Sequence, residues 1–279
     1  MDKDLIIVRA SKRSLHNVWL DSKTPRPWDL LICPYEDIPL SQPEGVYLSE
    51  VIPASKWKWG ALDILLNEWQ EWRNYRYVLL ADDDLLASQD TWSKFFERCA
   101  HYGAQLAQPG LRFGSYFSHP MTMQNTQFAA RRVSFVEIMM PCFRSDVLAQ
   151  LQATFKISPS GSGLGLDLLW AKQLEYKHLF IIDETAVHHT RPVHGAYPER
   201  LNEFRREAAD IVRRFQVPWL MKTFAGYLPG GQEVPERDGS FLYRLFQGNA
   251  HIFEAEPKRF EEMMRLQLEA GNPYADYLQ

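Results

Sequence analysis

The sequence predicts an α/β fold, a Rossmann-like and mainly parallel mixed sheet flanked by helices. In its first half, short apolar runs of strand length alternate with longer amphipathic segments, and this order is typical of a parallel sheet with helices on its faces. The 279 residues are 46% hydrophobic and 24% charged, a balance that is sufficient for a full hydrophobic core.

Three apolar runs, residues 4–10, 28–35 and 75–81, are predicted to form buried strands. Between the last two, apolar residues recur at the spacing of one helix face, which predicts a crossover helix. These residues are Leu62, Leu65, Leu66, Trp69 and Trp72. Asp90 is predicted to cap the next helix, which ends at Gly103, and residues 104–109 are predicted to form a further strand.

The second half begins with residues 110–132, which lack periodicity and are expected to form a long surface excursion. The elements predicted after it are a strand at 133–143, a helix capped by Ser145, a helix at 166–175, a last strand at 177–183, and helices at 198–215 and 257–271 separated by a linker or loop at 226–240. We therefore divide the chain into an α/β domain, residues 1–195, and a helical C-terminal extension, residues 196–279, packed on it.

Composition excludes several classes of protein. A formal net charge of -4 gives no electrostatic case for nucleic acid. The three cysteines, Cys33, Cys99 and Cys142, lie far apart, which argues against a disulfide framework and a zinc site and fits a reducing compartment. Because about eighteen consecutive apolar residues occur nowhere, we expect a soluble, cytoplasmic protein. The arginine-rich helix at 198–215 leaves open a peripheral contact with the inner face of the membrane, with a solvated charged face as the alternative.

Three consecutive aspartates, Asp82, Asp83 and Asp84, directly follow the strand predicted at 75–81. Buried carboxylates are costly unless they are paired or bound to a cation, and open α/β sheets bind ligands outside the carboxyl ends of their strands. In an extended chain Asp82 and Asp84 point one way and Asp83 the other. The first two can therefore offer oxygens to Mg²⁺ or Mn²⁺ beside a phosphate, while a turn or capping cluster is the alternative.

A second polar cluster, Asp183, Glu184, His188, His189 and Arg191, surrounds the end of the last predicted strand. A histidine there can supply a nitrogen ligand to manganese, and the planar guanidinium of Arg191 can hold phosphate oxygens. Each histidine taken alone is better explained as a hydrogen-bonded polar residue, and only the nearby aspartates make a ligand role equally good.

Two further acids occupy unusual positions. Glu137 interrupts the strand predicted at 133–143, where an acid facing the core would be costly, so we expect it to face the site or an arginine. Asp167 opens a helix directly after the segment SGSGLG, whose glycines allow close approach by a ligand. Interaction of Asp167 with the helix dipole is the alternative.

The segment SKWKWG places Lys56, Trp57, Lys58 and Trp59 at the start of a helix. The lysines can offer charge to a phosphate, and the tryptophans a stacking face to a base or sugar. Solvated lysines and packed tryptophans are the alternative.

Taken in order, four motifs resemble a domain-of-unknown-function family, number seven hundred and seven, with a glycosyltransferase-A-like fold. The motifs are ADDD at 81–84, SFVEIMMPCF at 134–143, GSGLGLDLLW at 161–170 and IIDETAVHH at 181–189. HNVW at His16 and SKWKWGA at Ser55 also have similar counterparts in that family. The likeness covers roughly residues 4–195 and is specific in the combination of its motifs. Leu164 stands where the family usually carries tryptophan, and the middle excursion is short.

This resemblance implies an enzyme that moves a sugar from a nucleoside-diphosphate sugar to a hydroxyl of a glycan or lipid-linked acceptor, in glycan or polysaccharide synthesis. It implies that Asp84 binds Mn²⁺ or Mg²⁺, that Asp82 lies near the ribose or metal, and that His188 is a second metal ligand. Glu137 and Asp167 would line the acceptor side, Asp167 as general base of an inverting reaction. The remaining residues expected to bind the nucleotide are Asp83, Lys56, Lys58 and Arg191.

Two other functions stay open at this point. A metal-dependent phosphohydrolase or phosphotransferase could use Asp82 as nucleophile, although such enzymes usually place this element near the start of the domain, and here two predicted strands precede it. A non-catalytic module that binds nucleotide-sugar or glycan is the other. The sugar, the base, the acceptor and the stereochemical outcome do not follow from the sequence.

Overall fold

The structure is a computed structural model and describes residues 3–20, 24–38, 43–193 and 198–268. Its strands are β1 (Asp4–Ala10), β2 (Trp28–Pro34), β3 (Val46–Leu48), β4 (Tyr77–Ala81), β5 (Leu85–Leu86), β6 (Leu106–Leu111), β7 (Ala130–Val133), β8 (Cys142–Arg144), β9 (Leu179–His189), β10 (Thr223–Tyr227) and β11 (Glu233–Pro235). They form one mixed sheet in the order β11-β10-β7-β9-β6-β8-β4-β1-β2-β3, and β5 pairs with β9 beside it. β1, β2, β3 and β4 are parallel, as are β6 and β9, whereas β8 runs antiparallel between β4 and β6.

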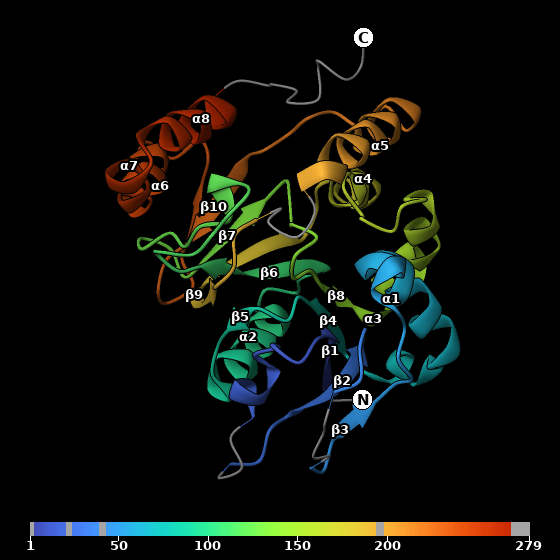
Figure 1. Cartoon of the computed structure of the whole chain (residues 1–279). Helices are drawn as coiled ribbons and strands as arrows, with labels where there is room; N and C mark the ends of the chain where they lie inside the picture. The colour runs from blue at the N-terminus through green and yellow to red at the C-terminus, as the bar shows by residue number, and fades with distance from the viewer. Residues whose placement is uncertain (1–2, 21–23, 39–42, 194–197, 269–279) are drawn as a thin grey trace.

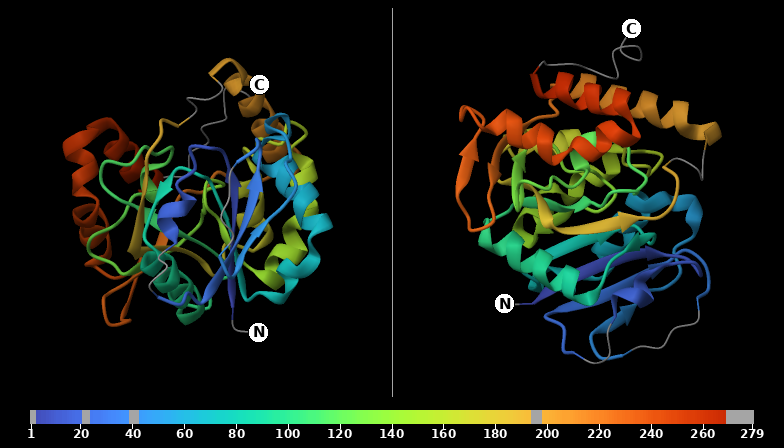
Figure 2. Two further views of the ribbon diagram at one scale, coloured as in Figure 1. Left: turned by 60° about the horizontal axis from the view of Figure 1, so that its bottom comes forward. Right: turned by 90° about the vertical axis from the view of Figure 1, so that its left-hand side faces the viewer.

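Helices cover both faces of this sheet (Figures 1 and 2). One face carries α1 (Trp57–Glu68), α3 (Ser145–Leu151), α4 (Leu166–Gln173) and α5 (Leu201–Arg214). The other carries α2 (Gln89–His101), α7 (Ala250–Ala255) and α8 (Pro257–Leu268), with α6 (Phe241–Gly248) beside them. No helix in the described part of the chain is long and apolar enough to cross a membrane.

The central strands are mostly apolar because both of their faces are covered. In β1, Leu5 and Ile7 pack into the core beneath α1, whereas Ile6 and Val8 pack into the core beneath α2. This alternation is the period of two expected of a strand, and a parallel strand that is buried on both faces needs apolar residues at every position. The strands predicted at 4–10, 28–35 and 75–81 and the helix between the last two are confirmed.

Two helix caps differ from the sequence prediction. Ser88, and not Asp90, caps α2, because its hydroxyl accepts a hydrogen bond from the backbone N–H of Thr91 at 3.1 Å. Asp90 lies one turn before Lys94 and forms an ion pair with it. Ser145 begins α3 without capping it, and its hydroxyl donates to the backbone oxygen of Tyr75.

The predicted strand at 133–143 is wrong, because its middle is a loop. The chain leaves the sheet after β7 and returns to it as β8, which lies on the far side of β9 and β6. Residues 134–141 span this distance, so Glu137 belongs to a buried loop rather than to a strand.

The C-terminal extension is helical but also extends the sheet. The expected linker at 226–240 contains part of a hairpin, in which β10 pairs antiparallel with both β7 and β11. β9 is therefore not the last strand. The predicted domain boundary between residues 195 and 196 lies outside the described residues.

A buried ion pair fixes the excursion predicted at 110–132. Arg131 on β7 donates two hydrogen bonds to Asp183 on β9, at 2.8 and 2.9 Å, and both side chains are 0% exposed. Arg131 also donates to the backbone oxygens of Met121 and Met123, and Asp183 accepts from the backbone N–H of Asn125. Burial raises the pKa of Asp183, and the guanidinium opposes this shift. Asp183 therefore orders the excursion and is not available to a ligand.

We expect Arg131→Met to lower the free energy of unfolding by about 3–5 kcal/mol, because it leaves the Asp183 carboxylate buried without a countercharge. The double variant Arg131→Met/Asp183→Leu should recover part of that loss, since no charge is then left unpaired. Glu184→Gln is the control: it removes the neighbouring, partly exposed pair with Arg98 and should change stability by less than about 1 kcal/mol. Urea unfolding measures all three, and equal losses in Arg131→Met and Glu184→Gln would contradict the assignment.

Candidate active site

The three aspartates that follow β4 have three different partners. Asp82 forms an ion pair with Lys58 at 2.7 Å, and Asp84 lies 3.3 Å from Nε2 of His189. Residues 83–84 form a turn, as in the alternative given for this cluster, and not the extended chain of the prediction, but Asp83 does have partners different from those of Asp82 and Asp84. It accepts hydrogen bonds from the backbone and hydroxyl of Ser11 and from Arg191.

The pairing of β5 with β9 decides which histidine reaches Asp84. Leu85 lies opposite His189, and Leu86 opposite His188. His189 therefore lies beside Asp84, whereas Nδ1 of His188 lies 3.3 Å from the hydroxyl of Ser115. The resemblance implies that His188 is a second metal ligand, whereas in the structure the histidine that lies beside Asp84 is His189.

His189 carries a positive charge at neutral pH. Burial lowers the pKa of His189, but the hydrogen bond to Asp84 and the charge of Asp84 raise it by more, so that the pKa is about 9. Its other nitrogen, Nδ1, lies 2.7 Å from the backbone oxygen of Tyr116, which is an acceptor. Both nitrogens thus face acceptors, which favours the doubly protonated ring.

Lys58 brings a second positive charge to the cluster from the first turn of α1. Its ammonium group donates to the backbone oxygens of Ile138 and Met139, at 2.8 and 2.6 Å, in addition to its ion pair with Asp82. Burial lowers its pKa, and the neighbouring Asp82 opposes this. Asp82 remains 37% exposed, so a ligand can reach it.

The other residues of SKWKWG do not form ion pairs or hydrogen bonds with the three aspartates in the way that Lys58 does. Lys56 is exposed. Trp57 packs edge-on against Phe204. Trp59 is fully buried against Phe155 and Trp170, which confirms the alternative of a packed tryptophan and leaves it unable to stack on a base or sugar.

Glu137 and Asp167 complete the cluster from two further segments. They are 5% and 6% exposed, and burial raises the pKa of each to about 7. The charge of Glu137 contributes to the shift of Asp167, and Asp82 to that of Glu137. Asp167 accepts from the backbone N–H of Leu168 at 2.9 Å, whereas Oε2 of Glu137 is buried without a hydrogen-bond partner.

The glycines before Asp167 serve packing and do not provide room for a ligand. Gly161, Gly163 and Gly165 all have positive φ angles, between 76° and 88°. A Cβ atom on Gly163 would lie 2.0 Å from the ring of Trp59, and one on Gly161 would lie 2.5 Å from the backbone oxygen of Lys56. The glycines let the chain pass close to the start of α1, which brings Asp167 and Lys58 to the same end of the molecule.

The second predicted cluster is divided by the structure. Asp183 is held by Arg131, and Glu184 forms an ion pair with Arg98. Arg191 pairs with Asp83 and donates to the backbone oxygen of Arg13.

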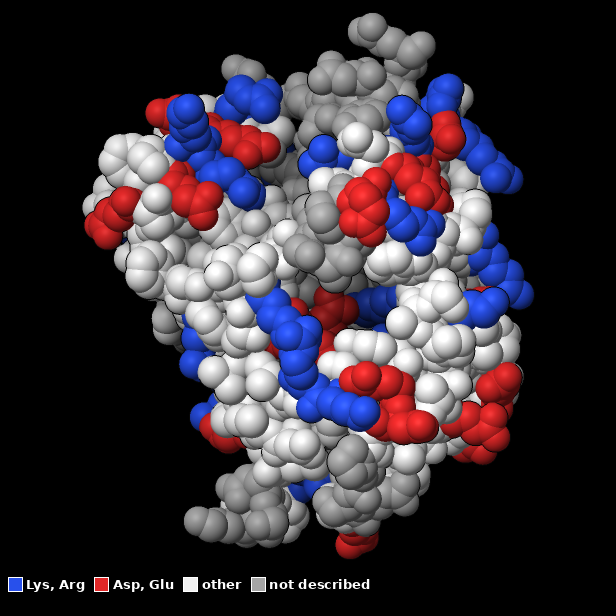
Figure 3. Space-filling view, viewed as in Figure 1, with Lys and Arg blue, Asp and Glu red and all other residues white. Residues whose placement is uncertain are grey.

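The space-filling view shows acidic side chains at the bottom of a hollow in the middle of one face of the molecule, with basic side chains around it (Figure 3).

The donor set for a metal ion is incomplete on the protein side. Among the described residues, no group of three His, Cys, Asp or Glu could hold an ion. One oxygen of Asp84, Oδ1, is buried without a hydrogen-bond partner, and Asp82 is accessible. These two carboxylates suit a hard cation whose remaining ligands come from phosphate oxygens and water.

The raised pKa of Glu137 predicts that its charge destabilises the fold. Folding raises the pKa of the Glu137 carboxyl from 4.5 to about 7. The folded protein therefore loses stability as the pH rises through that interval, because the folded state resists deprotonation of this group. Glu137→Gln should therefore become more stable than wild type by on the order of 3 kcal/mol between pH 5 and pH 8. Thermal unfolding across this range measures the difference.

The matched control is Asp146→Asn. The hydrogen bond from Arg144 lowers the pKa of Asp146, so the charge of Asp146 contributes stability above its ordinary pKa. This variant should be less stable than wild type by an amount that stays constant between pH 5 and pH 8, because both pKa values of Asp146 lie at or below 3.8. A difference from wild type that changes equally with pH in both variants over this range would contradict the assignment for Glu137.

The chain matches no family model and no curated protein. Among solved structures, it is similar to the crystal structure of S. aureus TarS 1–349, with a TM-score of 0.51 and 11% identity over 92% of this chain and 73% of that one. It also aligns with TarS 1–349 in complex with UDP and with UDP-GlcNAc, with TM-scores of 0.48 and 0.49, at 12% identity over 75% of this chain. The chain spans 65% of TarS 1–349 in the UDP complex. The fold expected from the sequence, glycosyltransferase-A-like α/β, is confirmed.

Proposed function

We propose that the protein is a glycosyltransferase that moves a sugar from a nucleoside-diphosphate sugar to a hydroxyl group of a glycan or lipid-linked acceptor. The observation that carries this proposal is the meeting of two kinds of carboxyl group at the carboxyl end of β4. Asp82 and Asp84 are paired with cations, whereas Glu137 and Asp167 are buried with pKa values of about 7. Membership in the domain-of-unknown-function family whose motifs it resembles is part of the same proposal.

The donor side supplies positive charge for the leaving group. Cleavage of the bond between the sugar C1 and the diphosphate oxygen leaves a nucleoside diphosphate with additional negative charge, which fixed cations stabilise. Lys58, protonated His189 and Arg191 are the cations around Asp82, Asp83 and Asp84. TarS 1–349, whose fold this chain shares, has been crystallised with UDP and UDP-GlcNAc, which supports a donor of this class.

Asp84 and Asp82 would hold Mn²⁺ or Mg²⁺ together with the diphosphate. Such an ion, when bound, acts as a Lewis acid toward phosphate oxygens. Asp84 offers its unpartnered oxygen. Lys58 keeps Asp82 in place and neutralises it before a ligand arrives, so these residues favour joint binding of ion and nucleotide over binding of the ion alone.

The acceptor side supplies a base. A carboxylate takes the proton of the acceptor hydroxyl. At the same time the oxygen of that hydroxyl forms a bond to the sugar C1, and the nucleoside diphosphate leaves with the electrons of the broken C1–O bond. A base acts best when its pKa lies near the working pH, and Asp167 and Glu137 both meet this condition. Asp167 is the proposed base because a backbone N–H holds its carboxyl group in one orientation.

Binding of the donor tests the first half of the proposal. Calorimetry with UDP should show binding to the wild type in the presence of Mn²⁺ or Mg²⁺, and chelation of the ion should weaken it. Asp84→Asn should weaken binding at least about tenfold, which corresponds to 1.4 kcal/mol. Asp90→Asn, an exposed aspartate paired with Lys94, is the control and should bind like wild type. A wild type that binds neither UDP nor another nucleoside diphosphate, with or without ion, would overturn the proposal.

Turnover tests the second half. Asp167→Asn should keep donor binding and lower kcat by roughly 10²–10⁴, the usual contribution of a general base. The wild-type rate should rise with pH to a plateau above about pH 7, because the base must be ionised, and the variant should lose this limb. Release of nucleoside diphosphate from a panel of nucleotide-sugars and glycan acceptors gives the rate. If Glu137→Gln and not Asp167→Asn removes the limb, the base is Glu137.

A further inference from the structure

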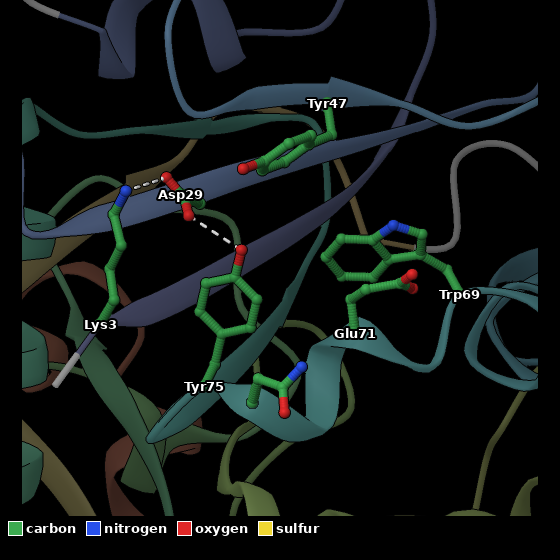
Figure 4. Close-up of a pocket in the computed structure, with 7 residues that line it drawn as sticks. Lys3, Asp29, Tyr47, Trp69, Glu71 and Tyr75 are labelled. Atoms are coloured by element: carbon green, nitrogen blue, oxygen red, sulfur yellow. Dashed lines mark hydrogen bonds and ion pairs between the residues drawn. The ribbon is translucent and has the colours of Figure 1, made fainter. Parts of the chain in front are cut away.

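A second pocket lies at the other end of the sheet (Figure 4). It has a volume of about 540 Å³ and is lined by Lys3, Asp29, Tyr47, Trp69, Glu71, Asn74 and Tyr75. Lys3 precedes β1, Asp29 lies near the start of β2, and Tyr75 precedes β4. The pocket is therefore at the amino ends of the strands, roughly 20 Å along β4 from the aspartate cluster at a rise of about 3.3 Å per residue.

A buried carboxylate forms the polar wall of this pocket. Asp29 is almost fully buried, pairs with Lys3 at 2.6 Å and accepts a hydrogen bond from the hydroxyl of Tyr75 at 2.8 Å. Burial and the neighbouring Asp29 raise the pKa of Tyr75, so its hydroxyl stays protonated. Glu71 and Asn74, which are exposed, add an acceptor and an amide to the rim.

Three aromatic rings, including that of Tyr75, form much of the remaining wall. Tyr47 and Trp69 have ring centroids 5.9 Å apart at an interplanar angle of 44°, and Trp69 and Tyr75 are 6.2 Å apart at 31°. Figure 4 shows the three rings around one open space, with Glu71 beside Trp69. Tyr47 lies on the edge strand β3 and is 42% exposed, so a ligand can reach its ring without a change in the core.

We propose that this pocket binds a pyranose ring of a glycan, separately from the active site. The C–H face of a pyranose is flat and weakly apolar and stacks on aromatic rings, while its hydroxyls both donate and accept hydrogen bonds. The walls offer these elements together: aromatic faces, N–H donors on Lys3 and on the amide of Asn74, and acceptors on Glu71 and on the hydroxyl oxygen of Tyr75, whose proton is donated to Asp29. An aromatic surface with a few placed polar groups is the usual composition of a small-molecule site.

The same rings do not form a cage for a quaternary ammonium ion. Such a cage surrounds the cation with ring faces, whereas these rings are tilted by 31° and 44° along one open wall. Lys3 is neutralised by its ion pair with Asp29, so the distinction rests on the ring geometry: a pyranose stacks on a single ring face and needs no cage.

Saturation-transfer NMR on the full chain tests this site with methyl pyranosides of glucose, galactose and N-acetylglucosamine, each alone and as an oligosaccharide. At least one should show transfer to its C–H protons, and Tyr47→Ala should weaken its binding about tenfold, on the scale of an aromatic contact. Glu71→Gln is a second variant whose exposed position spares the fold. Tyr243→Ala on α6, where the tyrosine is 69% exposed, is the control and should bind like wild type.

The outcomes separate this site from the active site. Binding that survives in Asp84→Asn and falls in Tyr47→Ala supports the proposal, whether or not the protein binds UDP. Binding lost in Asp84→Asn and unchanged in Tyr47→Ala and Glu71→Gln places the sugar in the active site and overturns it. No transfer to any pyranoside, or binding of tetramethylammonium in their place, also overturns it. Thermal unfolding of each variant confirms that the fold is intact.

Discussion

The active site depends on one buried ammonium group. Lys58 reaches from α1 to Asp82 after β4 and to two backbone oxygens of the loop between β7 and β8, so it joins three segments that are far apart in the sequence. Burying this charge is costly unless every contact is a good acceptor, and all three contacts are oxygens. The position of the loop, and with it that of Glu137, follows from this one group.

The charges around Lys58 do not balance. Two cations, Lys58 and His189, face four acids, Asp82, Asp84, Glu137 and Asp167. The folded chain compensates by retaining protons: burial, with help from the neighbouring acids, raises the pKa of Glu137 and Asp167. Asp82 and Asp84 have cationic partners, whereas Glu137 and Asp167 titrate near neutrality. One imbalance thus gives this site both ion-paired carboxyl groups and groups able to exchange protons.

Sequence reasoning found the features that depend on neighbours along the chain. The strand at 4–10 and the helix at 57–68 both follow from local periodicity. The features it missed depend on long-range pairing. The choice of His189 needs the register of β5 on β9, the burial of Asp183 needs Arg131, and the hairpin of β10 and β11 needs β7 as a partner.

Because His188 and His189 are consecutive, a one-residue insertion and a one-residue deletion in β9 have different effects on the cation beside Asp84. Successive side chains of a strand alternate between its faces, and β5 sets which position meets Asp84. An insertion of one residue between Asp183 and His188 would move His188 into the place of His189, and the cation would be kept. A deletion at the same point would bring Thr190 there instead, and the cation would be lost. With respect to the cation beside Asp84 alone, this segment therefore tolerates one added residue but not the loss of one.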